Sequence, residues 1–164
     1  MIILKFILTI ILTYYFAAVV QTTMHRAFGH HNRIQVIYET HSQGHHAKYP
    51  PQKLTSDQFE DAEQQVMWYY AFPFVPTGLL VFWLGGSGIL AGYVTGLLFA
   101  VWWHTYLHEQ YHLNHSFWHR FVWFQQKREL HLIHHCHARQ NYAIVEYWID
   151  RIMGTYKDKD RKEV

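Results

Sequence analysis

This sequence is poor in cysteine and in charged residues, and each scarcity excludes a class of protein. Cys136 is the only cysteine in 164 residues, so no disulfide forms within the chain. The chain has no CxxC pair, which argues against a structural zinc finger. It also has no GxGxxG motif, so we expect it to bind no nicotinamide cofactor itself. With 16% charged residues and a net charge of +2, the composition gives no argument for a nucleic-acid partner.

Long apolar stretches are what the chain has instead. A helix of about 20 apolar residues crosses the hydrocarbon core of a bilayer. Pro73 and Pro76 lie in the second stretch, where we expect them to kink a helix, as membrane helices tolerate. The uncharged Gly85–Gly88 turn joins the second and third stretches into a hairpin. We therefore predict an all-α membrane protein with about three transmembrane helices. The expected spans are about 1–23, 66–84 and 89–112.

The apolar stretches allow two other interpretations. The first stretch also resembles a cleaved signal peptide, with Lys5 as its positive region and Ala17 and Ala18 near a cut. Against this, the stretch runs directly into His25. The second and third stretches can also be buried helices of a soluble protein, but such helices seldom come as adjacent apolar blocks of this length.

The basic residues predict the orientation. The polar loop 24–65 carries four Lys or Arg residues, the tail 113–164 carries nine, and the Gly85–Gly88 turn carries none. The positive-inside rule puts the loop and the tail in the cytoplasm, and the turn and the amino terminus outside. Lys5 argues weakly for the opposite orientation. The 164 residues are then one domain whose histidines all lie on the cytoplasmic face, in a helical cap.

Ten of the fifteen histidines fall in four tight clusters, and imidazole is the commonest neutral metal ligand. We take these ten as the candidate metal ligands. The clusters are His25 and His30; His41, His45 and His46; His108 and His112; and His131, His134 and His135.

Helical geometry divides the clusters into two kinds. Residues four apart in an α-helix lie about 40° apart, so His108 and His112 can bind one ion. Residues five apart lie about 140° apart. A regular helix would therefore point His25 away from His30, and His41 away from His46. Either the helix breaks, for which Gly29 is well placed, or each such pair serves two ions. Ten imidazoles are too many for one ion and suit two.

Several assignments stay open at this level. All-nitrogen ligands suit zinc, copper, iron or nickel. The third cluster can also be paired as His104 with His108, although we prefer His108 with His112. Cys136 can be a thiolate ligand, but a bystander thiol is the simpler interpretation. A loose metal-storage tract would be repetitive, which these clusters are not. We interpret five further histidines as hydrogen-bonded polar groups: His31, His104, His115, His119 and His137.

The order of the clusters resembles the fatty acid hydroxylase superfamily, which includes the sterol desaturases. The resemblance rests on the strings HRAFGH, HSQGHH, HEQYH and HLIHH, and on the tail QNYAIVEYWIDRIMGTY, and it covers roughly residues 14–156. The tail departs from the family pattern at Ala143, Ile149 and Met153. The small carotenoid hydroxylases share the size and the clusters but lack this ending, so they rank second.

The resemblance implies a membrane di-iron oxidoreductase. Two iron ions, with zinc possible in recombinant samples, would activate O2 to hydroxylate or desaturate a C–H bond of a lipid such as a fatty acid or a sterol. The electrons would come from a small cytochrome or a ferredoxin with its reductase. The acids Glu39, Glu109 and Asp150 are candidates to hold the imidazole N–H groups, although we favour solvated surface charges for Glu39 and Glu109 and a structural role for Asp150. The rival from another class is a non-catalytic, histidine-lined metal-binding or transport protein.

Overall fold

Two long helices form the body of the molecule. The computed structural model describes residues 2–60 and 69–159. Helix α1 runs from Ile2 to Met24, and helix α4 runs from Phe74 to His112. Both are long and apolar enough to cross a membrane, and most of their side chains are exposed. Large apolar residues such as Leu12, Leu79 and Trp83 are each more than half exposed, as lipid-facing side chains are.

Short helices gather at one end of this pair and form a cap. The described residues contain no strand, and their only β contact is an isolated bridge between Ser56 and Leu113. The cap consists of the π-helical turns η1 (His25–Gly29) and η2 (Glu39–His45), the helices α2 (Gln35–Tyr38), α3 (His46–Lys48), α5 (Val122–Cys136) and α6 (Trp148–Met153), and the 3-10 turn η4 (Phe117–Arg120).

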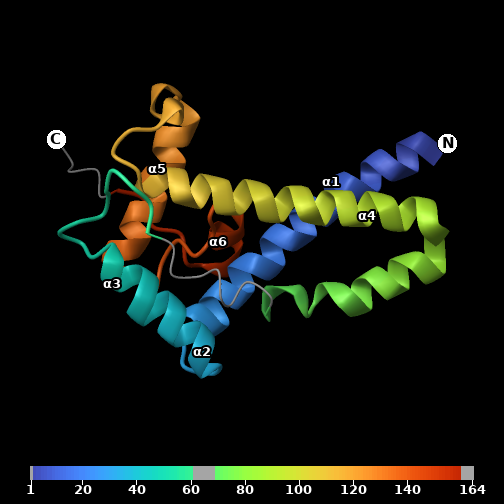
Figure 1. The fold of residues 1–164 in the computed structure, drawn as a ribbon, viewed down its shortest axis with the longest axis horizontal. Coiled ribbons are helices and arrows are strands. Elements are labelled where there is room, and N and C mark those ends of the chain that lie inside the picture. Colours follow the sequence, from blue (N-terminus) through green and yellow to red (C-terminus); the bar gives the residue numbers. More distant parts are fainter. Residues whose placement is uncertain (1, 61–68, 160–164) are drawn as a thin grey trace.

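Helix α4 folds back on itself at Gly86. The φ of Gly86 is 69°, a left-handed value that glycine adopts without the strain a side chain brings. An outer arm, 74–85, therefore turns into an inner arm, 87–112, as the green and yellow ribbons of Figure 1 show. This is the hairpin that the glycine-rich turn predicts.

The prediction for the second span was wrong in one respect. Pro73 is the cap of α4 and Pro76 lies in its first turn, so neither kinks a helix. Proline is tolerated there because the first turn leaves its N–H groups unbonded in any case. The outer arm covers only about 18 Å, which is less than the ~30 Å of a hydrocarbon core. Residues 66–68 of the predicted span lie outside the described residues.

Glycines let α1 and the inner arm approach closely. A Cβ atom on Gly96 would lie 2.6 Å from the backbone oxygen of Ile10, and one on Gly92 would lie 3.0 Å from that of Phe6. Small residues in this spacing are typical of packed membrane helices, where backbones come into contact. The backbone contact fixes how the two helices cross, and thereby the position of the histidines at their ends.

The two ends of the helical layer differ. In Figure 1 the amino terminus and the turn of α4 lie at one end, and the cap lies at the other. Glu60, the last described residue before the gap, belongs to the cap through a hydrogen bond from its backbone N to the Tyr49 hydroxyl. The loop before α4 and the tail after it therefore lie at the same end, as the count of apolar stretches predicts.

The orientation in the membrane stays a prediction, which labelling tests. Cys136 is exposed in the cap and Ser87 is exposed in the turn. In intact cells we expect the native thiol of Cys136 to be protected from an impermeant thiol reagent. A cysteine at Ser87, introduced in a Cys136→Ser background, should react. Permeabilised cells, in which both thiols should react, provide the control. The reverse pattern in intact cells would place the cap outside.

Candidate metal centre

The structure brings all ten clustered histidines together, in two groups of five. Within each group one ring nitrogen from every residue lies within 4.8 Å of all the others. Group 1 consists of His25, His30, His41, His46 and His134, and group 2 consists of His45, His108, His112, His131 and His135. Each of the four sequence clusters therefore contributes to this centre.

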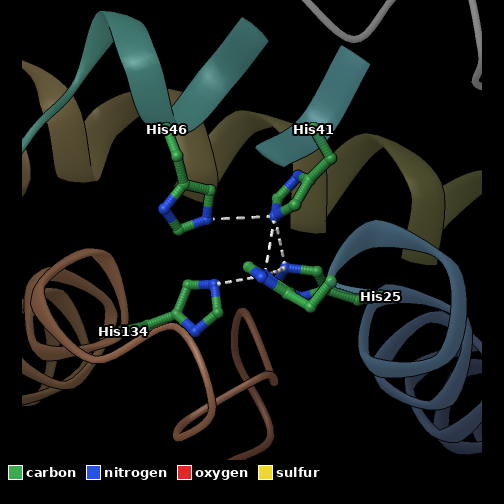
Figure 2. Close-up of side chains that lie close together, drawn as sticks. His25, His41, His46 and His134 are labelled. Carbon is green, nitrogen blue, oxygen red and sulfur yellow. Dashed lines mark hydrogen bonds between the residues drawn. The ribbon is translucent and has the colours of Figure 1, made fainter. Parts of the chain in front are cut away.

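Group 1 joins the end of α1 to the cap. His25 begins η1, His41 comes from η2, and His134 comes from α5. The Nε2 atoms of His25 and His41 are 2.7 Å apart, and those of His30 and His134 are 3.0 Å apart. Figure 2 shows the rings turned so that their nitrogens point toward a common centre.

Group 2 joins the end of α4 to α5. The Nε2 atoms of His108 and His45 are 3.0 Å apart, and those of His112 and His131 are 2.9 Å apart. The His135 ring also stacks on the His46 ring of group 1, with centroids 4.2 Å apart. The two groups therefore adjoin each other and form a single centre.

The π-helical turns explain how pairs five residues apart share a group. A π-helix closes i→i+5 bonds, so it brings residues five apart to the same side, whereas an α-helix does not. His25 is the first residue of η1 and His30 follows its last, and the backbone N of His46 bonds the carbonyl of His41 across η2. Both pairs belong to group 1. The alternative in which each pair serves two ions assumes α-helical geometry, which these two turns do not have.

Gly29 has a role that differs from the predicted helix break. It lies inside η1, and a Cβ atom there would lie 3.0 Å from the His25 ring and 3.1 Å from the His41 ring. Its carbonyl accepts a 2.6 Å hydrogen bond from Ser42 Oγ in η2. The glycine therefore gives two histidine rings room to meet and ties the two π turns together.

Among the described residues, backbone carbonyls accept hydrogen bonds from four of the ten histidine rings and so orient them. A ring whose Nδ1–H donates to a carbonyl has its lone pair on Nε2, which is the form that binds a metal. No carboxylate takes this position among the described residues, so neither Glu39 nor Glu109 holds a ligand ring there, and Glu39 is exposed, as the favoured interpretation of a surface charge predicts. The four bonds run from His25 to Tyr142 (2.5 Å), from His134 to Gln140 (2.7 Å), from His112 to Leu54 (2.8 Å) and from His135 to Tyr49 (2.9 Å).

The two groups fit metal ions. Rings held in this way present lone pairs to one another at close range, an arrangement that a cation between them stabilises. Two nitrogens at right angles around an ion, with bonds of about 2.1 Å, lie about 3 Å apart. The Nε2–Nε2 distances in both groups, from 2.7 to 3.2 Å, match this spacing. The assignment of each histidine as a ligand stays a prediction.

Burial keeps the cap histidines neutral. It lowers the pKa of His46 from its ordinary 6.5 to about 3. Burial is also the main cause that lowers the pKa values of His41, His131 and His134, and the neighbouring histidines lower them further. A neutral imidazole has a free lone pair, so these side chains can bind a metal at neutral pH without losing a proton first.

The same shifts predict acid instability of the metal-free protein. An unfolded chain protonates these histidines below about pH 6.5, whereas the folded one keeps His46 neutral down to about pH 3. Between these limits the unfolded state binds more protons, so stability falls as the pH falls. We expect the melting temperature in detergent with a chelator to be flat from pH 7 to 8.5 and to decrease steadily from pH 6.5 to 4. A melting temperature that rose on acidification would contradict this assignment.

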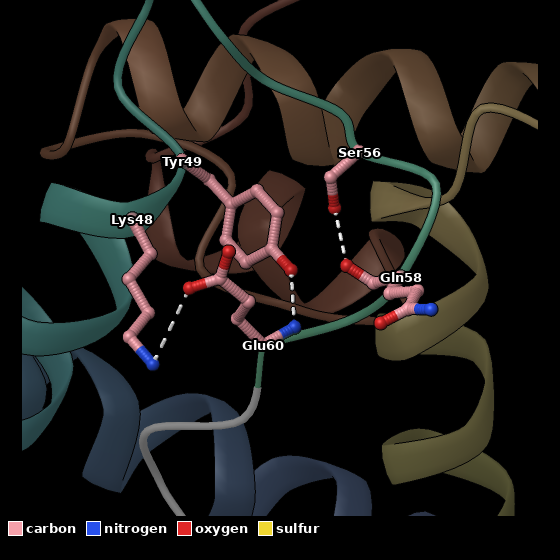
Figure 3. A network of polar contacts seen from close by, with 5 residues as sticks. All are labelled: Lys48, Tyr49, Ser56, Gln58 and Glu60. Carbon is pink, nitrogen blue, oxygen red and sulfur yellow. Dashed lines mark hydrogen bonds and ion pairs between the residues drawn. The ribbon is translucent and has the colours of Figure 1, made fainter.

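The segment after α3 covers group 2. The Tyr49 ring stacks on His112 with centroids 4.0 Å apart, while its carbonyl holds His135. Figure 3 shows how the segment is closed: the Tyr49 hydroxyl accepts from the Glu60 backbone N, and Lys48 pairs with the Glu60 carboxylate at 3.7 Å. The bend also contains a hydrogen bond from Ser56 Oγ to the carbonyl of Gln58. Tyr49 is a site residue that sequence reasoning missed.

The tail supports group 1 from behind. Asp150 is fully buried, and its carboxylate accepts hydrogen bonds from the backbone N of Tyr142 (2.8 Å), the backbone N of Ala143 (2.9 Å) and Thr155 Oγ1 (2.7 Å). Because the Tyr142 carbonyl receives the His25 Nδ1–H, Asp150 fixes the loop that orients His25. This is the structural role favoured for Asp150.

The other histidines lie outside both groups. His31, His115 and His137 are exposed, His119 is half-buried and His104 is buried. His104 lies one turn before His108 on α4 and belongs to neither group, so the alternative pairing of His104 with His108 is not the one that the fold makes. The exposed Cys136 also belongs to neither group.

An apolar cavity of about 150 Å³ leads from the long helices to the histidines. Its inner end is formed by His25 and His41 of group 1 and by His108 of group 2. The rest of its lining comes mainly from α1 and both arms of α4, including Ala17, Val20, Phe74, Ala100 and Val101. An apolar chain in this cavity would touch the metal centre at one end and the lipid-facing helices at the other.

Fold and site together define an all-helical protein with two helices that could span a membrane and two groups of histidines that could hold metal ions. The sequence model described as fatty acid hydroxylase matches residues 7–155, which is most of the chain. The chain therefore belongs to the fatty acid hydroxylase family, which is membrane-bound, typically di-iron, and generally composed of hydroxylases and desaturases. No curated protein and no solved structure matches it.

Proposed function

We propose that this protein is a membrane-bound di-iron oxidoreductase that uses O2 and supplied electrons to hydroxylate or desaturate a C–H bond of a lipid. The observation that carries the proposal is the apolar cavity that ends at both histidine groups. A lipid chain that enters between α1 and α4 reaches the metal centre without leaving an apolar environment.

Iron is proposed for both groups because the family is typically di-iron and because imidazole ligands suit iron. When bound, iron supplies the activation of O2. The protein holds the ligand rings through backbone carbonyls, surrounds them with buried side chains and lets the cavity select an apolar substrate. It also keeps water from the reacting C–H bond, since most of the ligand rings are buried.

The proposed orientation has three crossings, with the metal centre on the cytoplasmic face. Because the outer arm of α4 is shorter than the hydrocarbon core is thick, this orientation requires residues before Phe74 to contribute to the second crossing. Electrons would come from a separate protein, a small cytochrome or a ferredoxin with its reductase, because the sequence has no dinucleotide-binding motif.

A transport function is less well supported. A path for ions across the membrane needs polar groups along it. Lys5 and Glu109 are the only charged residues of α1 and α4, if the histidines near the carboxyl end of α4 are left aside. They lie near opposite ends of the helical layer, so they form no continuous path.

Lipid profiling under 18O2 tests the proposed function. Cells that express the chain with an electron-donor system are compared with cells that express a variant with alanine at both His134 and His135. We expect a lipid species that appears only with the unaltered chain and that carries one 18O atom or lacks two hydrogen atoms. If the iron-loaded protein leaves the lipid profile identical to that of the variant, the proposed function is wrong.

A further inference from the structure

One buried polar group in the cavity is not used by the metal centre. His104 lines the cavity from the inner arm of α4, and 6% of its surface is exposed. Within the part of the chain that the structure describes, its Nε2 atom has no hydrogen-bond partner. Buried polar groups nearly always have a partner, so an orphaned one in a binding cavity indicates a missing ligand.

Neighbouring side chains hold His104 in place without satisfying it. Its ring packs against the Tyr14 ring, with centroids 5.5 Å apart. The Tyr14 hydroxyl is engaged elsewhere, because it donates a 2.8 Å hydrogen bond to Glu146. Tyr14 thus supplies packing to His104 and leaves the ring free to bond a molecule in the cavity.

The surroundings of His104 define the chemistry of that molecule. None of the described residues that line the cavity is Lys, Arg, Asp or Glu. A charged group bound among these described side chains would be buried without a counter-charge from any of them, which is costly. The free ring nitrogen, Nε2, either donates or accepts one hydrogen bond, according to the tautomer of the neutral imidazole, and a hydroxyl group or an amide can be its partner in both cases. The partner is therefore an uncharged, oxygen-bearing group on an otherwise apolar molecule.

We propose that His104 determines substrate specificity by binding an uncharged hydroxyl or amide group of the lipid, beside the metal centre. The proposal rests on the proposed function and adds the substrate class and the region of reaction. His104 precedes His108 by four residues, which is about 6 Å along the helix. A polar group held at His104 places the carbons next to it nearest the histidine groups. The oxidised C–H bond then lies within a few carbons of that oxygen, and the remaining chain extends toward the lipid-facing side.

Binding measurements test this without turnover. The purified iron-loaded protein in detergent is titrated with radiolabelled hexadecan-1-ol, with hexadecanamide, hexadecane and palmitate as competitors. We expect the alcohol and the amide to bind about ten-fold more tightly than the alkane or the acid, as one buried hydrogen bond contributes. The preference should disappear in His104→Leu or His104→Phe and return in part in His104→Gln.

A matched control is His119→Leu, because the His119 Nε2 atom also lacks a partner among the described residues but lies outside the cavity. This variant should keep the full preference. Iron content and circular dichroism show which His104 variant is folded, and that variant is the one compared. A preference that persists in a folded apolar variant, or that is absent from the unaltered protein, overturns the proposal.

A second measurement uses the unaltered protein alone. An alcohol that carries a photoreactive diazirine on its second carbon should label the peptide 97–108 or the facing part of α1 near Tyr14. Labelling confined to the far end of the helices, at residues 3–10 or 79–90, would overturn the proposal. A failure of the proposed function is distinct: ligands would bind with this preference while no product formed under 18O2.

Discussion

His134→Ala and His135→Ala should each remove about one of the two metal ions, and each a different one. The two residues are adjacent on α5, yet His134 belongs to group 1 and His135 to group 2. Loss of a ligand leaves four imidazoles in one group and five in the other, so one ion is bound more weakly. We expect turnover to fall by at least about 100-fold in both variants, because changes around a metal ligand already cost 10–100-fold.

Metal analysis of the purified variants, together with spectroscopy of the remaining ion, measures this. The two single variants should leave ions in different ligand environments, and the double variant should lose both. His115→Ala is the control, since His115 is exposed and lies outside both groups. Full metal content in His134→Ala, or loss of metal in His115→Ala, would show that the groups are assigned wrongly.

Asp150→Asn should destabilise the whole cap. Its carboxylate accepts three hydrogen bonds in a fully buried position, and an asparagine amide cannot accept all of them. A buried donor left unpaired costs about 1–3 kcal/mol, so we expect a loss of about 2–4 kcal/mol. This corresponds to a decrease of about 5–15 °C in the melting temperature. Group 1 should also bind its ion more weakly, because the Tyr142 carbonyl that orients His25 is displaced.

Asp158→Asn provides the matched control, since Asp158 is exposed and, among the described residues, accepts only from the backbone N of Lys159 beside it. Its melting temperature should stay within about 2 °C of that of the unaltered protein, the range of surface substitutions. Thermal unfolding in detergent, with and without a chelator, separates the effect on the fold from the effect on the metal. A stable Asp150→Asn protein that still binds both ions would contradict this role for the tail.

The apolar pattern and the histidine spacing predict much of this arrangement. Apolar stretches of membrane length predict α1 and the inner arm, because burial in lipid requires helices with apolar surfaces. The four-residue spacing of His108 and His112 predicts that they share a group, and α4 is regular enough there for the rule to hold. The glycine-rich turn predicts the reversal at Gly86, where φ is positive.

Other features depend on tertiary contacts that periodicity does not carry. The π turns at η1 and η2 reverse the prediction for pairs five residues apart, and nothing in the local sequence distinguishes them from α-helix. The partners of the ring N–H groups are carbonyls such as that of Tyr49, and any residue type can supply a carbonyl. A pattern of side chains therefore could not identify them. His104 had the spacing of a ligand, and only the fold separates it from the groups.

Metal stoichiometry of the unaltered protein tests the central claim most directly. The protein is made with iron supplied, purified in detergent, and analysed for iron and zinc per folded chain. Two groups of five imidazoles predict a total of close to two ions, whether iron alone or iron with competing zinc. A reproducible total of one or less in fully folded protein would contradict a dinuclear centre.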